Sequence, residues 1–129
     1  MPPPARPTNG PKRGDDFARH GYVPALGDII HLDRSPTMGD EMRGPHYGVV
    51  LSATLFNQGT GMVMVVPITS KTGKLSGFEL PITAGRVKGA TILSHLRSLD
   101  YQSRSLQFEA RLDEPTVTEA NRRLRLIFP

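Results

Sequence analysis

The stretch GVVLSATLFNQGTGMVMVVPITS, residues 48–70, decides the fold because it holds two apolar runs separated by turn-forming residues. The first run, which extends back to Tyr47, predicts a strand at residues 47–51, and the second predicts a strand at residues 62–68. Asn57, Gln58 and Gly59 predict a turn between them. Because the second run is continuously apolar, it is typical of a central strand with both faces covered.

Short apolar runs recur on both sides of this stretch. They predict further strands at residues 29–32, 78–80, 90–93 and 107–112. Residues 34–45 are polar and rich in Gly and Pro, and they predict a loop. This loop is longer than a hairpin needs, and long loops on compact domains are often functional.

The end of the chain has a helical pattern instead. Pro115 follows Asp113 and Glu114 and suits the first turn of a helix. Apolar side chains then recur at three- and four-residue spacing, at Val117, Ala120, Leu124 and Ile127. Arginines concentrate in the last turns, where positive charge suits the helix macrodipole. Many short strands with one terminal amphipathic helix predict a mainly-β fold, a small and partly open β-barrel.

The first 20 residues differ from the rest of the chain. They are rich in proline and basic residues and contain almost no apolar side chains. Such a segment cannot offset the entropy lost on ordering, so we predict a disordered basic tail over residues 1–20. One folded domain is expected over residues 21–129. Two interpretations of the tail stay open, a functional basic arm and an extension without function.

The composition limits the cellular compartment and the class of binding partner that we expect for this chain. The chain has no cysteine, which excludes disulfides and thiolate metal sites. No apolar run is long enough for a membrane span or a signal peptide, so we expect a soluble cytoplasmic protein. The formal net charge of +4 and the isoelectric point near 9.9 favour an anionic partner such as nucleic acid or an acidic protein.

Four segments in order carry a resemblance to a known family. They are YVPALGDIIHLDRSPTMGDE, GVVLSATLFNQGTGMVMVVPITS, GFELPI and GATILSHLRSLD. Together they resemble the MazF/PemK/Kid family of toxin endoribonucleases from about Tyr22 to Arg104, with the C-terminal helix also in its expected place. Each motif is short, and the specificity lies in their common order and spacing.

The resemblance implies an SH3-like β-barrel of the MazF/PemK/CcdB type, usually a homodimer. It implies the toxin of a type II toxin–antitoxin pair, a metal-independent ribonuclease that cuts single-stranded RNA at short sequences. It further implies an acidic antitoxin, encoded alongside, that blocks the RNA groove, and DNA binding by the toxin–antitoxin complex. No cofactor is expected.

Cleavage without a metal uses the ribose 2′-hydroxyl as nucleophile and needs a base, an acid and donors to the phosphate. The family normally has an arginine just before Pro-Ala-Val-Val-Leu, and His46 stands in that place here, followed by Tyr47 and Gly48. Histidine can act as base or acid at neutral pH. Arg43, three residues earlier, offers a cation. We predict that His46 and Arg43 are catalytic; the alternative is that His46 is an exposed strand-end residue.

Residues 69–71 and the long loop supply further candidates. Thr69 matches the family's active-site threonine in VPITS, and its hydroxyl can donate to a phosphate oxygen, so it is the third predicted catalytic residue. Ser70 and Lys71 follow and are predicted to hold RNA. Glu41 matches an acidic residue of the family's loop and is predicted to contact a base edge or orient the cation. Ordinary turn and surface roles for these residues stay open.

A second departure from the family lies in ILSHLRS. Some relatives have an arginine and a catalytic aspartate where Ile92 and Ser94 stand here, so an arginine–aspartate mechanism is not supported. His95 offers a second proton-transfer group, and a His46–His95 pair is one hypothesis. Arg97 keeps the family's basic position. We predict that Ser94, His95 and Arg97 contact RNA.

The four histidines show no metal-ligand spacing, so we predict no metal. His31 stands where relatives often have tryptophan and is expected to pack or to lie on the surface. Two rival functions stay open beside the endoribonuclease. One is a catalytically weakened module that binds RNA or antitoxin, and the other is a gyrase-directed toxin of related fold.

Overall fold

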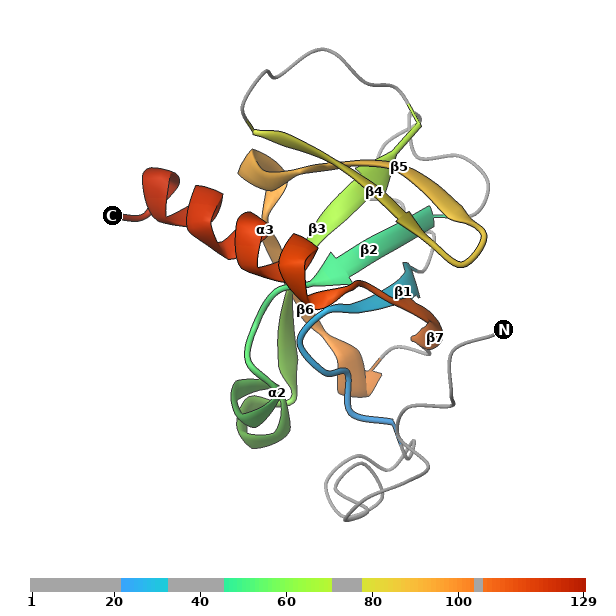
Figure 1. Ribbon diagram of the computed structural model, residues 1–129. Coiled ribbons are helices and arrows are strands. Elements are labelled where there is room, and N and C mark those ends of the chain that lie inside the picture. Colours follow the sequence, from blue (N-terminus) through green and yellow to red (C-terminus); the bar gives the residue numbers. More distant parts are fainter. Residues whose placement is uncertain (1–21, 33–45, 71–77, 104–105) are drawn as a thin grey trace.

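The structure, a computed structural model, describes residues 22–32, 46–70, 78–103 and 106–129. This part of the chain forms one curled antiparallel sheet with a long helix packed on it (Figure 1). The strands are β1 (Asp28–Leu32), β2 (His46–Val50), β3 (Met62–Thr69), β4 (Glu79–Ala84), β5 (Val87–Ile92), β6 (Arg97–Asp100) and β7 (Gln107–Arg111). The helices are α2 (Thr54–Thr60), α3 (Glu114–Ile127) and the short 3₁₀ turns η3 (Leu93–His95) and η4 (Tyr101–Ser103).

The strand order is β4-β5-β3-β2-β1-β7, and β6 pairs with β3 beside this path. β3 is therefore central. It pairs with β2 along one side, and along the other side it pairs first with β6 and then, at Ile68 and Thr69, with β5. The prediction of a central strand from the continuous apolar run is confirmed.

The sheet curls until the two ends of its strand order approach each other. The turn between β4 and β5 contains Gly85, whose φ of +58° favours glycine. A Cβ placed on Gly85 would lie 3.5 Å from the Cβ of Ala110 in β7. Figure 1 shows the tip of this hairpin folded over toward β7. The predicted mainly-β, partly open barrel with a C-terminal helix is confirmed.

Side chains alternate between two faces of the sheet, and each face has its own core. We call the face that carries Ile29, Val49 and Val66 the inner face, and the face that carries Ile30, Val50 and Val65 the outer face. The inner core also contains buried residues of β4, β5, β7 and α3. The outer core is smaller and is completed by Val23, Leu99 and Tyr101.

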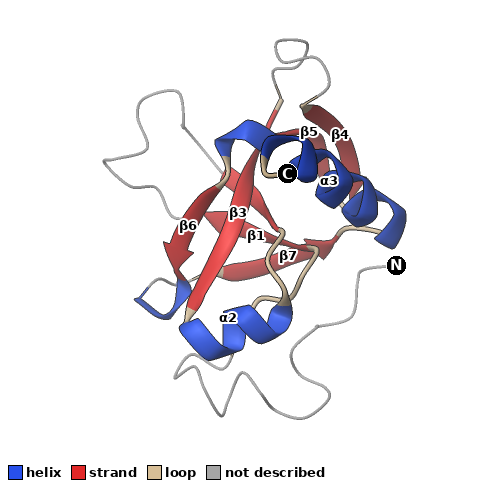
Figure 2. Ribbon diagram, turned by 90° about the vertical axis from the view of Figure 1, so that its left-hand side faces the viewer, coloured by secondary structure: helices blue, strands red, loops and turns tan. Residues whose placement is uncertain are grey.

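The C-terminal helix forms where the apolar spacing predicts it. Asp113 precedes α3 and Pro115 lies in its first turn. Ala120 is buried, and Val117, Leu124 and Ile127 pack against the inner core. Arg122 lies exposed and Arg123 is partly buried, donating to the Glu79 carbonyl of β4; both arginines pair with Glu119. Figure 2 shows α3 and α2 on separate parts of the sheet.

The turn predicted at Asn57, Gln58 and Gly59 is wrong, because these residues lie inside α2. Asn57 is completely buried, and its side-chain amide donates to the Pro24 carbonyl at 2.8 Å and accepts from the Ser52 hydroxyl. These side-chain contacts, one of them with a carbonyl 33 residues away, override the local turn preference. The helix ends at Gly61, whose φ is +74°.

Two other elements differ from the sequence prediction. β6 has no counterpart in it, since Leu99 is the single buried residue in the strand. β4 runs on through Pro81, which the apolar run at 78–80 does not suggest. A proline is acceptable there because β4 is the edge strand of the described sheet and Pro81 faces solvent.

The predicted tail at residues 1–20 and most of the predicted loop at 34–45 lie outside the described residues. The described chain begins at Tyr22, whose hydroxyl donates to the buried Asp28 carboxylate at 2.7 Å. None of the helices in the described ranges combines the length and apolar character needed to cross a bilayer.

Candidate active site

His46 and Thr69 occupy adjoining strand ends. His46 is the first residue of β2 and Thr69 is the last residue of β3. Tyr47 pairs with Ile68 in the antiparallel register of these strands, so one further step sets His46 beside Thr69. Directly opposed residues have Cβ atoms about 4.5–5.5 Å apart. The two predicted catalytic side chains therefore lie within reach of one phosphate group.

Both side chains project to the outer face. His46 lies two steps from Gly48 and four from Val50, which faces the outer core. Thr69 lies four steps from Val65, also an outer-core residue. Leu32, which pairs with His46 across β1 and β2, belongs to the same core. The ends of three strands thus converge on one patch of the outer face.

His46 is buried, with 8% of its surface exposed. Its Nε2 is shielded from solvent and has no hydrogen-bond partner in the described structure. A buried polar atom without a partner costs about 1–3 kcal/mol, and in native proteins it requires an explanation.

Arg97 adds positive charge to the same face. It pairs with Val65 across β6 and β3, so its side chain starts on the outer face. Val65 lies four residues from Thr69 along β3, roughly 13 Å at the rise of an extended strand. Arg97 therefore lies on the same face as Thr69, farther along β3.

The backbone near Thr69 is held by a close approach of β5. A Cβ placed on Gly89 would collide with the carbonyl oxygen of Thr69. Glycine at this position lets the two strands meet. The position of the Thr69 backbone therefore depends on glycine at position 89 of β5.

A family model described as "PemK-like, MazF-like toxin of type II toxin-antitoxin system" matches residues 25–128 of the chain. The chain belongs to this family. The match covers every described element from β1 to α3. The family assignment made from the ordered sequence segments is confirmed.

Individual relatives agree with this assignment. The endoribonuclease toxin MazF of Escherichia coli (strain K12) is 35% identical over 83 residues, which is 64% of this chain and 74% of that protein. The crystal structure of MazF from Deinococcus radiodurans superposes with a TM-score of 0.71 at 30% identity and covers 83% of this chain and 97% of that one. A MazE–MazF structure from the same organism gives a TM-score of 0.68 at 28% identity, with the same shares of the two chains.

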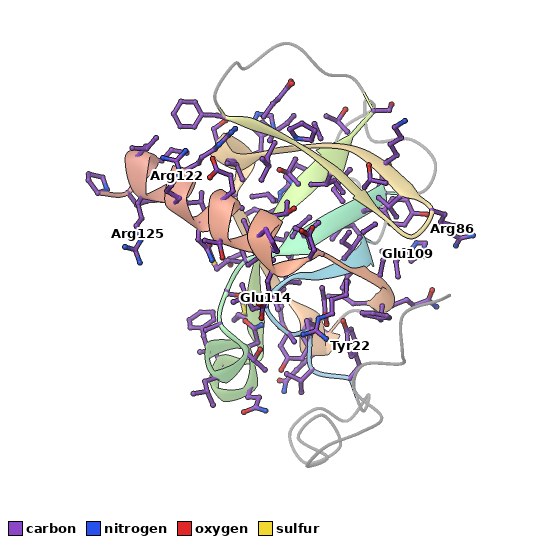
Figure 3. The ribbon with its side chains drawn as sticks, in the orientation of Figure 1. Tyr22, Arg86, Glu109, Glu114, Arg122 and Arg125 are labelled. Carbon is purple, nitrogen blue, oxygen red and sulfur yellow. The ribbon has the colours of Figure 1, made fainter. Side chains whose placement is uncertain are left out.

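This MazF-like domain also has a polar cluster that the sequence analysis missed. Nε2 of His31 lies 2.7 Å from Oε1 of Glu109, and Nε of Arg86 lies 2.8 Å from Oε2 of the same carboxylate. The rings of His31 and Tyr47 lie 4.7 Å apart. Figure 3 shows Arg86 and Glu109 side by side at the tip of the β4–β5 hairpin. We call His31, Tyr47, Arg86 and Glu109 the closing cluster.

The closing cluster has clear electrostatic consequences. The hydrogen bond from Arg86, with a smaller contribution from His31, holds the pKa of Glu109 below its ordinary value. Glu109 in turn raises the pKa of Arg86. An ionised carboxylate can only accept hydrogen bonds, so Nε2 of His31 carries the hydrogen and donates it to Glu109. The expectation that His31 merely packs or lies on the surface misses this pairing.

The other predicted site residues fall into two groups. Ser70 is exposed just after β3, and Ser94 and His95 are exposed in η3. η3 contacts α3, which covers the inner face, whereas His46 faces outward, so the described geometry gives no support to a His46–His95 pair. Arg43, Glu41 and Lys71 lie outside the described residues.

Metal ligands do not gather in the described part of the chain. Within residues 22–32, 46–70, 78–103 and 106–129, no group of three or more His, Asp or Glu side chains could hold an ion. The absence of a metal from the reaction stays a prediction. No sequence signal could have found the closing cluster, because its members come from four separate segments whose pairing depends on the curl of the sheet.

Proposed function

We propose that this chain is the toxin of a type II toxin–antitoxin pair and acts in the cytoplasm as a metal-independent, sequence-specific endoribonuclease on single-stranded RNA. The observation that carries the proposal is the position of His46 beside Thr69 on the outer face. Family membership and the endoribonuclease names of the Escherichia coli relatives support the choice of reaction.

In the proposed reaction the imidazole of His46 takes the proton of the ribose 2′-hydroxyl. The 2′-oxygen forms a bond to phosphorus, the bond from phosphorus to the 5′-oxygen breaks, and the leaving oxygen takes a proton from a general acid. The products are a 2′,3′-cyclic phosphate and a 5′-hydroxyl. Thr69 donates a hydrogen bond to a phosphate oxygen as negative charge grows there.

Positive charge and RNA contacts surround this pair. We propose Arg43, on the sequence resemblance, as a catalytic cation. The remaining proposed RNA contacts are Glu41, Ser70, Lys71, Ser94, His95 and Arg97. Because Nε2 of His46 is shielded from solvent in the free protein, RNA must uncover it on binding. Exclusion of water from that place strengthens the electrostatic contacts of the reacting groups.

Cleavage of a mixed-sequence RNA in EDTA tests the reaction class. A 2′,3′-cyclic phosphate next to a 5′-hydroxyl end is the expected product. His46→Ala and Thr69→Val are each expected to lower the rate at least tenfold to a hundredfold. Thr83→Val, at an exposed threonine of β4, is the matched control and is expected to cleave normally. RNA that is bound but left intact by the folded wild type would instead assign a binding module.

We also propose an acidic antitoxin as partner. The Deinococcus radiodurans relative was crystallised as a MazE–MazF complex, and the net charge of +4 suits an acidic peptide. A disordered acidic segment would fold onto the outer face that carries Arg97 as it binds. The complex is expected to elute earlier than either protein in gel filtration and to bind DNA, and an unchanged elution volume on mixing contradicts the partnership.

A homodimer is the assembly that the family resemblance implies. Sedimentation velocity of the purified toxin at micromolar concentration tests it. A single species of about twice the mass of the 14.1 kDa chain is expected, and a monomer at all concentrations contradicts it.

A further inference from the structure

We propose that Glu109 is a positioning residue that sets the spacing between His46 and Thr69, with Arg86 and His31 as its two arms. This inference rests on the proposed function for its catalytic readout. It assigns a role to the closing cluster, which touches neither of the two proposed catalytic side chains directly. A continuous series of contacts connects Glu109 to the strands that carry these two side chains.

The first arm leads from Glu109 to His46. Glu109 accepts a hydrogen bond from His31, and His31 pairs with Tyr47 in the register of β1 and β2. The rings of His31 and Tyr47 are also in contact, at 4.7 Å between centroids and an interplanar angle of 53°. Tyr47 is bonded to His46 through one peptide unit. Tyr47 is thus held on the inner face by contacts that lead back to Glu109, while His46, the preceding residue, faces outward.

The second arm leads from Glu109 to Thr69. Arg86 donates two hydrogen bonds to the Glu109 carboxylate, at 2.8 and 3.2 Å, from the turn that begins β5. Farther along the same strand, Ala90 pairs with Thr69, and Gly89 lies against the Thr69 carbonyl. The position of the hairpin therefore fixes the end of β3.

The two series of contacts are linked to each other, because β2 and β3 are themselves paired at Tyr47 and Ile68. One carboxylate with only 11% of its side chain exposed thus ties both catalytic strand ends to the opposite edge of the sheet. Loss of that tie allows the hairpin and β2 to move independently. A misplacement of about 1 Å between reacting groups can cost about a hundredfold in rate.

The test compares Glu109→Ala with Glu119→Ala. Glu119 also pairs with two arginines, but on α3, so it is the control for the loss of a paired carboxylate; one of these arginines, Arg123, also donates to the Glu79 carbonyl at the start of β4. Glu109→Ala is expected to lower kcat about tenfold to a hundredfold with KM within about twofold of the wild type. Glu119→Ala is expected to change neither.

A second readout does not depend on activity. The His46 ring Cε1–Hε1 signal in ¹H–¹³C NMR is expected to shift in Glu109→Ala and to stay in place in Glu119→Ala. If Glu109→Ala does not fold, Arg86→Ala decides instead, because 73% of the Arg86 side chain is exposed and its loss leaves both cores intact. Arg86→Lys, which keeps the charge, is expected to restore part of the rate.

The outcomes separate the two proposals. Wild-type kcat together with an unmoved His46 signal in Glu109→Ala, or in Arg86→Ala if that variant decides, overturns the positioning role and leaves the proposed function standing. If the folded wild type does not cleave RNA, the proposed function fails. The His46 signal then still decides whether Glu109 positions this ring, since a shift supports it and an unmoved signal refutes it.

Discussion

Arg86 and Glu109 join the two ends of the strand order. Arg86 lies in the turn of the β4–β5 hairpin, at one end of the order, and Glu109 lies in β7, at the other. Their side chains meet at 2.8 Å (Figure 3). His31 of β1 also contacts the Glu109 carboxylate. In the described sheet, β4 and β7 are not paired through their backbones, and an ion pair between side chains joins the two ends of the barrel instead.

Stability should depend on pH through Glu109. Its lowered pKa means that the folded protein binds fewer protons than the unfolded chain in acid, so the free energy of unfolding falls as the pH drops below the ordinary Glu value of 4.5. Glu109→Gln is expected to flatten part of this fall in urea titrations between pH 6 and about 3. Glu114→Gln, at the exposed start of α3, is the control. Parallel curves for Glu109→Gln and wild type contradict the prediction.

The Asn57 side chain should be a major source of stability. It links α2 to the Pro24 carbonyl and the Ser52 hydroxyl inside the protein. Asn57→Ala leaves the Pro24 carbonyl without this donor and removes the acceptor of the Ser52 hydroxyl, which keeps the hydrogen bond that it accepts from the Met64 amide, and the change is expected to lower the free energy of unfolding by about 2–4 kcal/mol in urea titration. Leu55→Ala, on the same helix with 80% of the residue exposed, should stay within about 0.5 kcal/mol. Equal effects of the two changes would falsify this view of α2.

Gly89 should be intolerant of a side chain. Gly89→Ala forces β5 away from the Thr69 carbonyl, so we expect a loss of about 1–3 kcal/mol in thermal or urea unfolding and a lower rate of RNA cleavage. Gly59→Ala is the matched control, since a Cβ there meets nothing within 4 Å and alanine favours the helix. A fully active, stable Gly89→Ala protein shows that the close approach is unimportant.

Arg97 should contribute a phosphate contact. Arg97→Ala is expected to weaken the binding of an uncleavable single-stranded RNA and to reduce the slope of log K against log salt by about 1. Arg125→Ala, in the last turn of α3, removes the same charge from an exposed helix and should leave the slope unchanged. Filter binding or fluorescence anisotropy at several salt concentrations measures both. If both variants lower the slope equally, net charge and not position explains the binding.

The main-chain plan could be predicted from the sequence because burial leaves a local pattern. The run at residues 62–68 is apolar on both faces, and β3 is enclosed by two cores. The spacing of Val117, Ala120 and Leu124 likewise matches the side of α3 that packs on the sheet. Patterns of this kind reflect whether each residue is buried, so they can be recognised in the sequence without knowing which other segment it contacts.

The closing cluster and α2 could not be predicted in the same way. Glu109 meets His31 across 78 residues of chain, and Asn57 meets Pro24 across 33. Such contacts depend on the final curl of the sheet, and polar residues carry no periodic signal for it. The pairing of His46 with Thr69 was anticipated through the family motif, whereas the burial of His46 was not.

The central position of β3 has a consequence for the lifetime of the fold. Val63 and Val65 point into one core and Val66 into the other, and the strand is hydrogen-bonded along both edges. Fraying of a strand end, or the loss of the packing on one face of the sheet, does not expose its amide hydrogens to exchange with deuterium. They are released when the domain opens as a whole, so a proteolytic enzyme that removes this toxin must first wait for, or force, global unfolding.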